Sequence, residues 1–411
     1  MSDCCSAPGL MPFAEAYQRL MSSIAVKQES QLVAIEDAVG RVLKSDLFSP
    51  VNVPPHNNSA MDGYAIKHTD NADKVSYENV GSSFAGAPFY GNCENGQCIR
   101  IMTGAKMPSC CDTVIMQEQA TVDGNMVRFN KAIRPAQNVR MAGEDIAKGD
   151  VVLAKGHKIK AVDIGLLASL GVETVEVVKA VTVAVLSTGD ELKLPGQVLS
   201  DGDIYESNRF ALIAMLEKMH VNIIDFGIIT DDKQKIRQAF VDANEQADIV
   251  ISSGGVSVGE ADYTKEVLEQ LGEIDFWKIA MKPGKPFAFG KLSKSIFFGL
   301  PGNPVSALVT FYKLASKGIE KMQGIEDKPA LWLCAELTNN IKKSPGRIDF
   351  QRAIYSYNEN GQPVVSTTGS QGSGILTSIG KANCFIVLAA EDGPQQTGNK
   401  VRVEPFNYLF S

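Results

Sequence analysis

A segment near the middle of the chain combines small, hydroxyl and acidic side chains in an order that could bind an anion. It reads DIVISSGGVSVGEADY over residues 248–263. Its short β-branched start predicts a buried strand, and the apolar spacing from residue 263 onward predicts a helix. Backbone N–H groups lack internal partners where a helix begins, and glycines let an oxyanion approach them. We therefore predict an anion-binding loop that contains Ser252, Gly254, Gly255, Ser257 and Gly259.

Two carboxylates, Glu260 and Asp262, follow directly in this segment. Acids beside an anion site are explained if a hard cation such as Mg²⁺ lies between carboxylate and phosphate. A tight turn followed by a charged helix start is the structural alternative.

More acids stand at the ends of the other strands expected in this region. From residue 181 onward, expected strands alternate with expected helices, which predicts a doubly wound, mostly parallel sheet. Ligands of such sheets bind at the carboxyl ends of the strands. Those ends carry STGDE at 187–191, Asp231 with Asp232, the glycine-rich segment, and PGNP at 301–304. Alternatively, Asp190 and Asp232 only cap a turn or a helix.

Three lysines lie in the segment WKIAMKPGKPF at residues 277–287. Prolines 283 and 286 restrict this segment, which favours binding of an oxyanion over a freely solvated surface. Carboxylates for a cation and lysines for phosphate are the groups that phosphoanhydride chemistry requires. No Walker motif, GxGxxG motif or Ser-His-Asp grouping is visible, which weighs against ordinary kinases, dehydrogenases and hydrolases.

The rest of the chain predicts β-rich units around this α/β region. Helices are expected at 13–24, 35–43 and 162–170, and short β segments with frequent turns precede residue 145 and follow residue 329. We expect a multidomain α/β protein with these units: a doubly wound sheet domain (179–328), an inserted all-β domain (49–145), a discontinuous helical or mixed linking and dimerisation domain (1–48 and 146–178), and a small C-terminal β-barrel (329–411).

Composition excludes several classes of function. The 411 residues carry a net charge of −7, without the basic surplus of nucleic-acid-binding proteins. No apolar run approaches the ~20 residues that span a bilayer, and the start does not resemble a secretory signal, so we expect no membrane partner and a cytoplasmic location. The eight cysteines include no CxxC pair. Cys93, Cys98, Cys110 and Cys111 match no zinc framework, so free thiols are expected and a metal site is the alternative.

Seven motifs stand in one order along nearly the whole chain: NSAMDGYA (58–65), RIMTGA (100–105), GEDI (143–146), STGDEL (187–192), SSGGVSVGEADYT (252–264), KPGKPFAFG (282–290) and GLPGNPVSA (299–307). Together they resemble the molybdopterin molybdenumtransferase family, the bacterial relatives of the gephyrin C-terminal domain. Taken alone, the loops at 58–64 and 101–105 are more typical of structural turns.

The resemblance implies an enzyme that inserts molybdate into adenylylated molybdopterin, releases AMP and uses Mg²⁺. It implies that the β domain supplies Asp62 and Thr103, and that Lys278 and Lys282 face the anionic substrate. Pro301 and Pro304 would shape the pocket. The implied metal-binding carboxylates are Asp145, Glu191, Asp231 and Asp262.

The resemblance also implies an elongated homodimer, in which β-domain residues of one subunit reach the α/β pocket of the other. Other enzymes of the molybdenum-cofactor pathway are further candidate partners. Two alternatives stay open: a molybdopterin adenylyltransferase, which shares the α/β domain, and a non-catalytic scaffold like gephyrin. The additional β domains weigh against the first.

Overall fold

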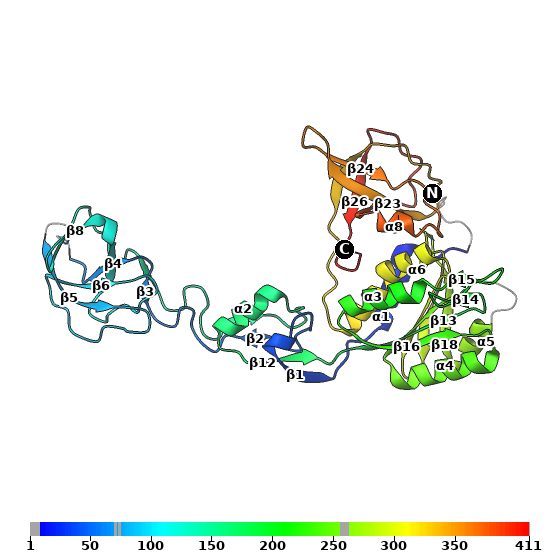
Figure 1. The fold of residues 1–411 in the computed structure, drawn as a ribbon, viewed down its shortest axis with the longest axis horizontal. Coiled ribbons are helices and arrows are strands. Elements are labelled where there is room, and N and C mark those ends of the chain that lie inside the picture. Colours follow the sequence, from blue (N-terminus) through cyan, green and yellow to red (C-terminus); the bar gives the residue numbers. More distant parts are fainter. Residues whose placement is uncertain (1–8, 70–71, 73–74, 255–262, 411) are drawn as a thin grey trace, which may run out of the picture.

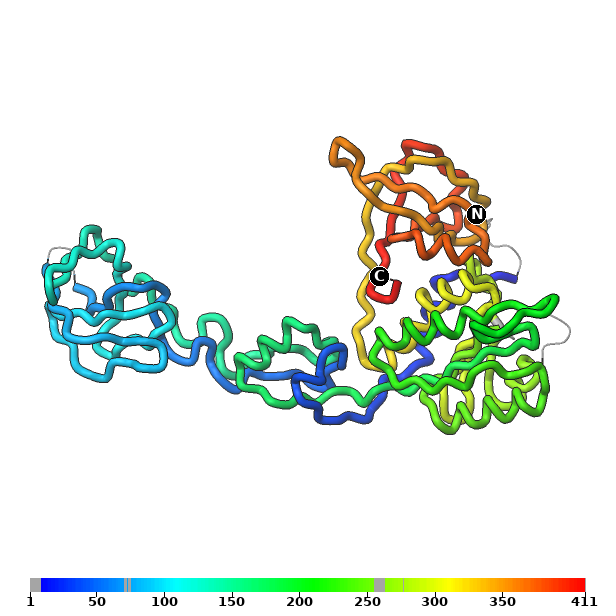
Figure 2. Tube along the Cα trace, in the orientation of Figure 1, coloured from blue at the N-terminus to red at the C-terminus, as the bar shows by residue number. Residues whose placement is uncertain are grey.

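The chain is elongated, with a β-rich unit at one end and an α/β unit beneath a β-barrel at the other (Figures 1 and 2). The computed structural model describes residues 9–69, 72, 75–254 and 263–410. Among the helices of these residues, none is both long and apolar enough to cross a membrane.

The α/β unit is built on a six-stranded sheet. Its strand order is β16 (Asn222–Ile229), β13 (Thr182–Thr188), β17 (Ile249–Ser253), β21 (Ile296–Leu300), β20 (Pro286–Leu292) and β18 (Gly272–Lys278). The first four strands are parallel to one another, and β20 runs antiparallel to both of its neighbours, β21 and β18. Strands β18 and β20 were not among the expected alternating strands and helices. They lie on either side of the lysine segment, whose composition is typical of a loop.

Helices cover both faces of this sheet, because alternate residues of its strands are apolar on both sides. Val183 and Val185 point to α3 (Asn208–Lys218) and α6 (Pro304–Thr310). Ala184 and Leu186 point to α4 (Lys233–Gln246) and α5 (Tyr263–Leu271). The structure thus has the doubly wound arrangement predicted from residues 181–322.

The N-terminal helix α1 (Phe13–Ser23) also packs into this α/β core, through Ala16, Leu20 and the following Ile24. It lies against α7 (Ser316–Met322), which continues α6 through the π-helical turn Phe311–Ala315. A Cβ at Gly318 would lie 2.8 Å from Ile24 Cδ1, so glycine allows the close approach. We expected residues 1–48 to form one unit with residues 146–178. Residues 30–48 do pair with that later segment, whereas helix α1 lies in the α/β core.

A narrow mixed unit connects the two ends of the molecule. It pairs β1 (Ser30–Ala34) with β12 (Thr174–Val178) and β2 (Leu47–Phe48) with β11 (Val151–Leu153), beside α2 (Ala161–Ser169). The prediction of a helix near 162–170 is confirmed, whereas that of a helix at 35–43 is wrong. Only the 3₁₀ turn Ile35–Asp37 forms there, because Gly40 has a left-handed backbone with φ of +80°.

Gly40 also marks the contact between this unit and the α/β unit. A Cβ at Gly40 would lie 2.1 Å from Cδ2 of the His220 ring, which follows α3. Gly40→Ala should therefore destabilise the protein by about 1–3 kcal/mol more than Gly171→Ala, measured by urea unfolding. Gly171 is the matched control, because its φ is +71° but its Cβ would meet nothing within 4 Å. Equal losses for the two variants would contradict the steric argument.

The β-rich unit at the far end contains a six-stranded sheet. Its order is β7 (Thr113–Met116), β4 (Gly63–Ile66), β6 (Gln97–Ile101), β5 (Ser76–Ser83), β9 (Met126–Phe129) and β8 (Ala120–Asp123). A short ladder of β3 (Asn58–Ser59) with β10 (Val139–Arg140) lies beside it. Its core contains Tyr64, Ile66, Tyr77 and Phe129.

The C-terminal unit is a closed five-stranded barrel. Its strands are β23 (Ile348–Tyr357), β24 (Pro363–Thr367), β22 (Leu333–Leu337), β26 (Lys400–Pro405) and β25 (Cys384–Leu388), and β25 pairs back to β23. Strand β19 (Met281–Lys282) adds to β23 from the lysine segment of the α/β unit. The predicted barrel is confirmed, and this added strand joins it to the sheet domain.

Candidate functional site

Asp62 and Thr103 meet in the β-rich unit. Asp62 directly precedes β4 and Thr103 follows β6, so the antiparallel pairing of these strands brings them together. Asp62 Oδ1 accepts hydrogen bonds from Thr103 N and Thr103 Oγ1, both at 2.7 Å. The backbone bond, followed by the hydroxyl bond, lowers the pKa of Asp62. The structure thus presents an ionised carboxylate beside a hydroxyl, with Thr103 exposed.

Removing the Thr103 hydroxyl should raise the pKa of Asp62 towards its ordinary value. In Thr103→Val the backbone bond remains, so we expect the pKa to stay below that of an unperturbed aspartate. A depressed pKa contributes stability above the ordinary pKa, and that contribution is lost as pH falls through the folded-state value. NMR titration of the Asp62 carboxyl carbon measures the change, with Thr121→Val as the control. An unchanged Asp62 titration in Thr103→Val would contradict this assignment.

Asp145 lies where the β-rich unit joins the mixed unit. Its backbone N–H donates to Val53 O at 3.1 Å, and its side chain is exposed. The neighbouring Ile146 pairs with Val53 across the two chain segments that connect these units.

The carboxyl ends of three parallel strands are tied together in the α/β unit. Asn208 Nδ2 donates to Ser253 Oγ and to Gly302 O, both at 2.8 Å. Gly254 N donates to Leu300 O at 3.2 Å, and a Cβ at Gly254 would lie 3.0 Å from Thr188 O. This close approach explains the glycine and places the predicted Ser252 and Gly254 at the ligand edge of the sheet. Other predicted members lie outside the described residues: Gly255, Ser257, Gly259 and Asp262.

Exposed acids flank this edge. Asp231 N donates to Asp190 Oδ1 at 3.0 Å, which links the loops after β16 and β13. A Cβ at Gly189 would lie 2.6 Å from Glu191 Oε2, so the Glu191 carboxylate folds over a backbone that only glycine leaves open. Asp232 instead caps α4 by accepting from Gln234 N and Lys235 N, which is the structural role left open above for one acid of that pair.

Exposed carboxylates at a ligand edge can bind a cation that is also coordinated by the substrate. Within the described ranges, no three carboxylate side chains converge closely enough to hold one ion. Mg²⁺ commonly uses one or two carboxylates and takes further oxygen ligands from phosphate and water. Glu191 and Asp231 are therefore candidate ligands for Mg²⁺, whose remaining oxygens substrate and water would supply.

Lys282 lies in a cationic cavity of about 330 Å³ between the lysine segment and the barrel. Its Nζ is 3.4 Å from Asp349 Oδ2, and the pairing of β19 with β23 places it there. The lining residues are Lys282, Lys342, Lys343, Ser344, Arg347, Asp349 and Pro394. Four cationic side chains against one carboxylate make this a cavity for an anion. Lys278, exposed at the end of β18, is not among its lining residues.

Sequence reasoning missed three of these cations, Lys342, Lys343 and Arg347. The signal was the basic run KKSPGR at 342–347. Only the tertiary pairing of β23 with β19 reveals that this run faces Lys282.

The predicted prolines form the turn between these two regions. Pro301 is buried after β21, and Pro304 is the first residue of α6. Val305 N donates to Ser373 O at 3.0 Å. The C-terminal unit thus accepts a hydrogen bond from one of the N–H groups that have no partner within the first turn of this helix. The Asn303 side chain makes no capping bond. The start of α6 therefore contacts the C-terminal unit, and Gly302 in the preceding turn is linked to the strand end at Ser253 through Asn208.

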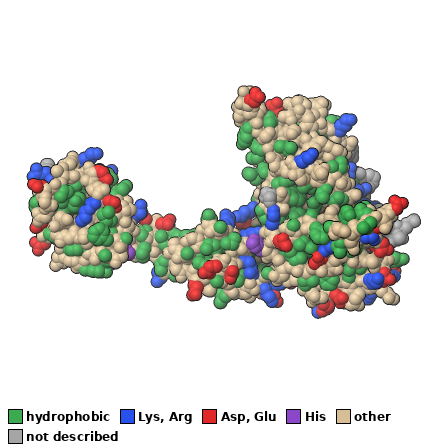
Figure 3. All heavy atoms as spheres, viewed as in Figure 1, with side chains coloured by type: hydrophobic (Ala, Val, Ile, Leu, Met, Phe, Trp, Pro, Cys, Tyr) green, Lys and Arg blue, Asp and Glu red, His purple; other side chains and the backbone are tan. Residues whose placement is uncertain are grey.

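Within one chain, the predicted site residues form separate groups. The Asp62–Thr103 pair lies in the unit at one end of the molecule, and Glu191, Asp231 and Lys282 lie at the other (Figure 1). In the view of Figure 3, the narrow mixed unit separates the two ends, each of which carries both acidic and basic side chains. A single chain thus does not gather all predicted residues into one cavity.

Comparisons with known proteins match the chain region by region. Residues 11–171 match the MoeA N-terminal region (domain I and II), 184–321 a probable molybdopterin binding domain, and 334–406 the MoeA C-terminal region (domain IV). The chain is 46% identical over 403 residues to a molybdopterin molybdenumtransferase of Haemophilus influenzae, covering 98% of this chain and 100% of that protein. It is 32% identical to gephyrin of Dictyostelium discoideum, over 97% of this chain and 62% of that protein. A crystal structure of a molybdopterin biosynthesis moeA protein from Pyrococcus horikoshii superposes with a TM-score of 0.84 at 28% identity, covering 97% of this chain and 100% of that one.

Proposed function

Since the chain belongs to the molybdopterin molybdenumtransferase family, we propose that this transferase acts in molybdenum cofactor biosynthesis by inserting molybdate into adenylylated molybdopterin, with release of AMP. The main support for the proposal is the cationic cavity around Lys282, which is lined by residues of both the sheet domain and the barrel. Oxyanions are the ligands that such a cavity binds. Molybdate and the phosphates of the nucleotide are both oxyanions.

Each region contributes a distinct task to this reaction. Ser252 and Gly254 fix the start of the glycine-rich segment at the strand ends through internal hydrogen bonds. The segment that follows them would orient the phosphate-containing part of the substrate. Lys282 and Arg347 attract and hold oxyanions in the neighbouring cavity. Glu191 and Asp231, with Asp262 as a further predicted carboxylate of the α/β unit, would hold Mg²⁺. Asp145 lies near the β-rich unit, so it could join them only from a second copy of the chain. When bound, this ion supplies positive charge to the phosphate oxygens.

The separation of Asp62 and Thr103 from the strand ends supports a site shared between two copies of the chain. We propose a homodimer in which the β-rich unit of one subunit faces the α/β unit of its partner. An elongated chain with a narrow connection suits this arrangement, because its far end can extend past its own α/β unit (Figure 2). Asp62 would then act as an ionised carboxylate near the oxyanions and the cation of the partner's site.

Nucleotide cleavage should require both Mg²⁺ and molybdate. Purified chain is mixed with adenylylated molybdopterin, and AMP and metal-loaded cofactor are quantified with each component omitted in turn. We expect product only with both components, because release of AMP accompanies metal insertion. Equal AMP release without molybdate would indicate a nucleotide pyrophosphatase instead. Adenylylation of molybdopterin by ATP without molybdate would indicate the adenylyltransferase alternative.

A further inference from the structure

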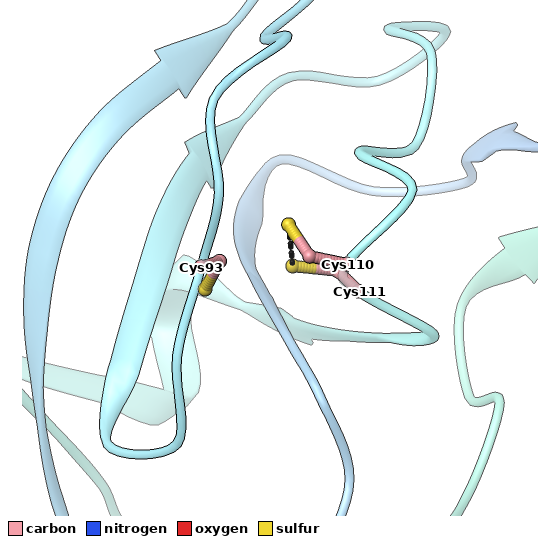
Figure 4. A group of neighbouring side chains, drawn as sticks. All are labelled: Cys93, Cys110 and Cys111. Atoms are coloured by element: carbon pink, nitrogen blue, oxygen red, sulfur yellow. Dashed lines mark hydrogen bonds between the residues drawn. The ribbon is translucent and has the colours of Figure 1, made fainter.

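Three cysteines from two separate loops meet in the β-rich unit (Figure 4). Cys93 lies in the connection between β5 and β6, and Cys110 and Cys111 lie in the connection between β6 and β7. Their sulfur atoms all lie within 4.8 Å of one another. We propose that this thiol cluster, Cys93, Cys110 and Cys111, binds a thiophilic metal cation, with Zn²⁺ as the expected ion.

The spacing of the sulfurs fits a metal ion with little rearrangement. Zn–S bonds of about 2.3 Å place two sulfurs of a tetrahedral site about 3.8 Å apart. The Sγ atoms of Cys110 and Cys111 are 3.9 Å apart, so these neighbouring residues already have a suitable separation. Cys93 needs to move inward by only about 1 Å to complete the set. The sequence spacing matched no zinc framework, because folding rather than a local motif brings Cys93 to the pair.

The present partners of the thiols are weak and replaceable. Cys93 Sγ donates to Gln97 O at 3.3 Å, and Cys110 Sγ lies 3.9 Å from Gly91 O. Cys110 and Cys111 are half-buried, which leaves solvent access for an ion and for a water as fourth ligand, whereas Cys93 is only 8% exposed. The cluster thus has a protected side and an open side, as expected of a site with three protein ligands.

Charge favours a divalent over a monovalent cation at this position. Three thiolates with Zn²⁺ leave a net charge of about −1, whereas Cu⁺ leaves about −2. Partial burial penalises the larger residual charge.

An ion at this position would fasten two loops to the core of the β-rich unit. Cys111 packs against buried residues of that core, among them Ile101, Met107 and Val114. The connection between β6 and β7 that contains Cys110 and Cys111 also contains Thr103. Bound Zn²⁺ should therefore stabilise this unit against thermal unfolding, by an amount that grows with the logarithm of the free Zn²⁺ concentration once the site is filled. The inference does not depend on the proposed function.

The test is a Zn²⁺ competition titration of the reduced full chain against a chromogenic chelator. Cys4 and Cys5, outside the described residues, are first replaced by serine so that they do not contribute. We expect one Zn²⁺ per chain, and a loss of affinity of more than about 100-fold in Cys93→Ser and in Cys110→Ser. Cys334→Ser is the matched control and should not change binding, because Cys334 is an exposed thiol of the distant barrel.

Several results would overturn the proposal. They are the absence of stoichiometric Zn²⁺ binding, unchanged affinity in both cluster variants, and binding of Cu⁺ but not Zn²⁺. A Cys93–Cys110 disulfide that forms in air, in a chain that binds no Zn²⁺ when reduced, would also overturn it. Circular dichroism of both variants separates loss of a ligand from loss of the fold. In the parent chain, Zn²⁺ should raise the thermal midpoint, and neither variant should show that rise.

Discussion

Asp62→Ala should lower the rate of molybdenum insertion by a factor of about 10²–10³, while the protein keeps its fold. Asp62 presents a carboxylate whose lowered pKa keeps it ionised, fixed by two hydrogen bonds from Thr103. Its removal takes a negative charge out of a site that we propose to hold a cation and oxyanions. The measurement is metal-loaded cofactor formed per minute, with circular dichroism as the check on folding. Activity equal to wild type would remove the shared-site hypothesis.

Mixing two inactive variants tests whether the site is shared between subunits. Glu191→Ala alters the α/β end of the chain and Asp62→Ala the opposite end, so each homodimer lacks a complete site. A mixed dimer would contain one site that combines both intact halves. Exchange of subunits at equal concentration should restore about one quarter of wild-type activity, since half of the dimers are mixed and each has one intact site. No recovery despite demonstrated subunit exchange would place both residues in one chain's site or outside it.

Lys282→Ala should raise the KM for adenylylated molybdopterin by about 10–100-fold, because a charge-assisted hydrogen bond to an oxyanion is worth about 1.5–3 kcal/mol. Lys282 lines the cationic cavity and lies 3.4 Å from the buried Asp349. Its removal also takes an ion-pair partner from Asp349. The variant Lys282→Arg keeps the positive charge and therefore separates loss of charge from other effects of the substitution. We expect this second variant to recover most of the loss. Initial rates at varied substrate concentration give the comparison.

Lys294→Ala provides the matched control for this experiment. Lys294 is an exposed lysine paired with Glu245 on another surface of the α/β unit. Its replacement changes the net charge equally but should leave the KM unchanged. If both alanine variants raised the KM alike, overall charge rather than the cavity would account for the effect.

Local sequence patterns were sufficient for most elements of the α/β unit. Strand 222–229 and the helices that begin at Asn208 and end near Gln246 follow directly from runs of apolar residues and their spacing. The same patterns failed at residues 35–43, where Gly40 turns the chain and its apolar neighbours pack as extended segments and turns. Apolar spacing alone does not report a left-handed residue.

The candidate site was only partly predictable, because its parts come from pairings between distant segments. Asp62 and Thr103 are 41 residues apart and meet only through the register of β4 with β6. Lys282 meets Arg347 because β19 joins β23 in parallel. Periodicity indicates that strands exist but not which strands become neighbours. The roles of Lys278, Pro301 and the carboxylates remain predictions that rest on family resemblance.

The two passages of chain through the narrow connection run side by side. Val53 pairs with Ile146, and Ser49 bonds in both directions with the segment 149–150. The chain therefore enters and leaves the β-rich unit at nearly the same point, so this unit is an insertion within the rest of the fold. Excising it and closing the gap with a short turn should leave a self-sufficient smaller protein. Such an arrangement lets a whole unit be gained, lost or exchanged during evolution without rebuilding the rest.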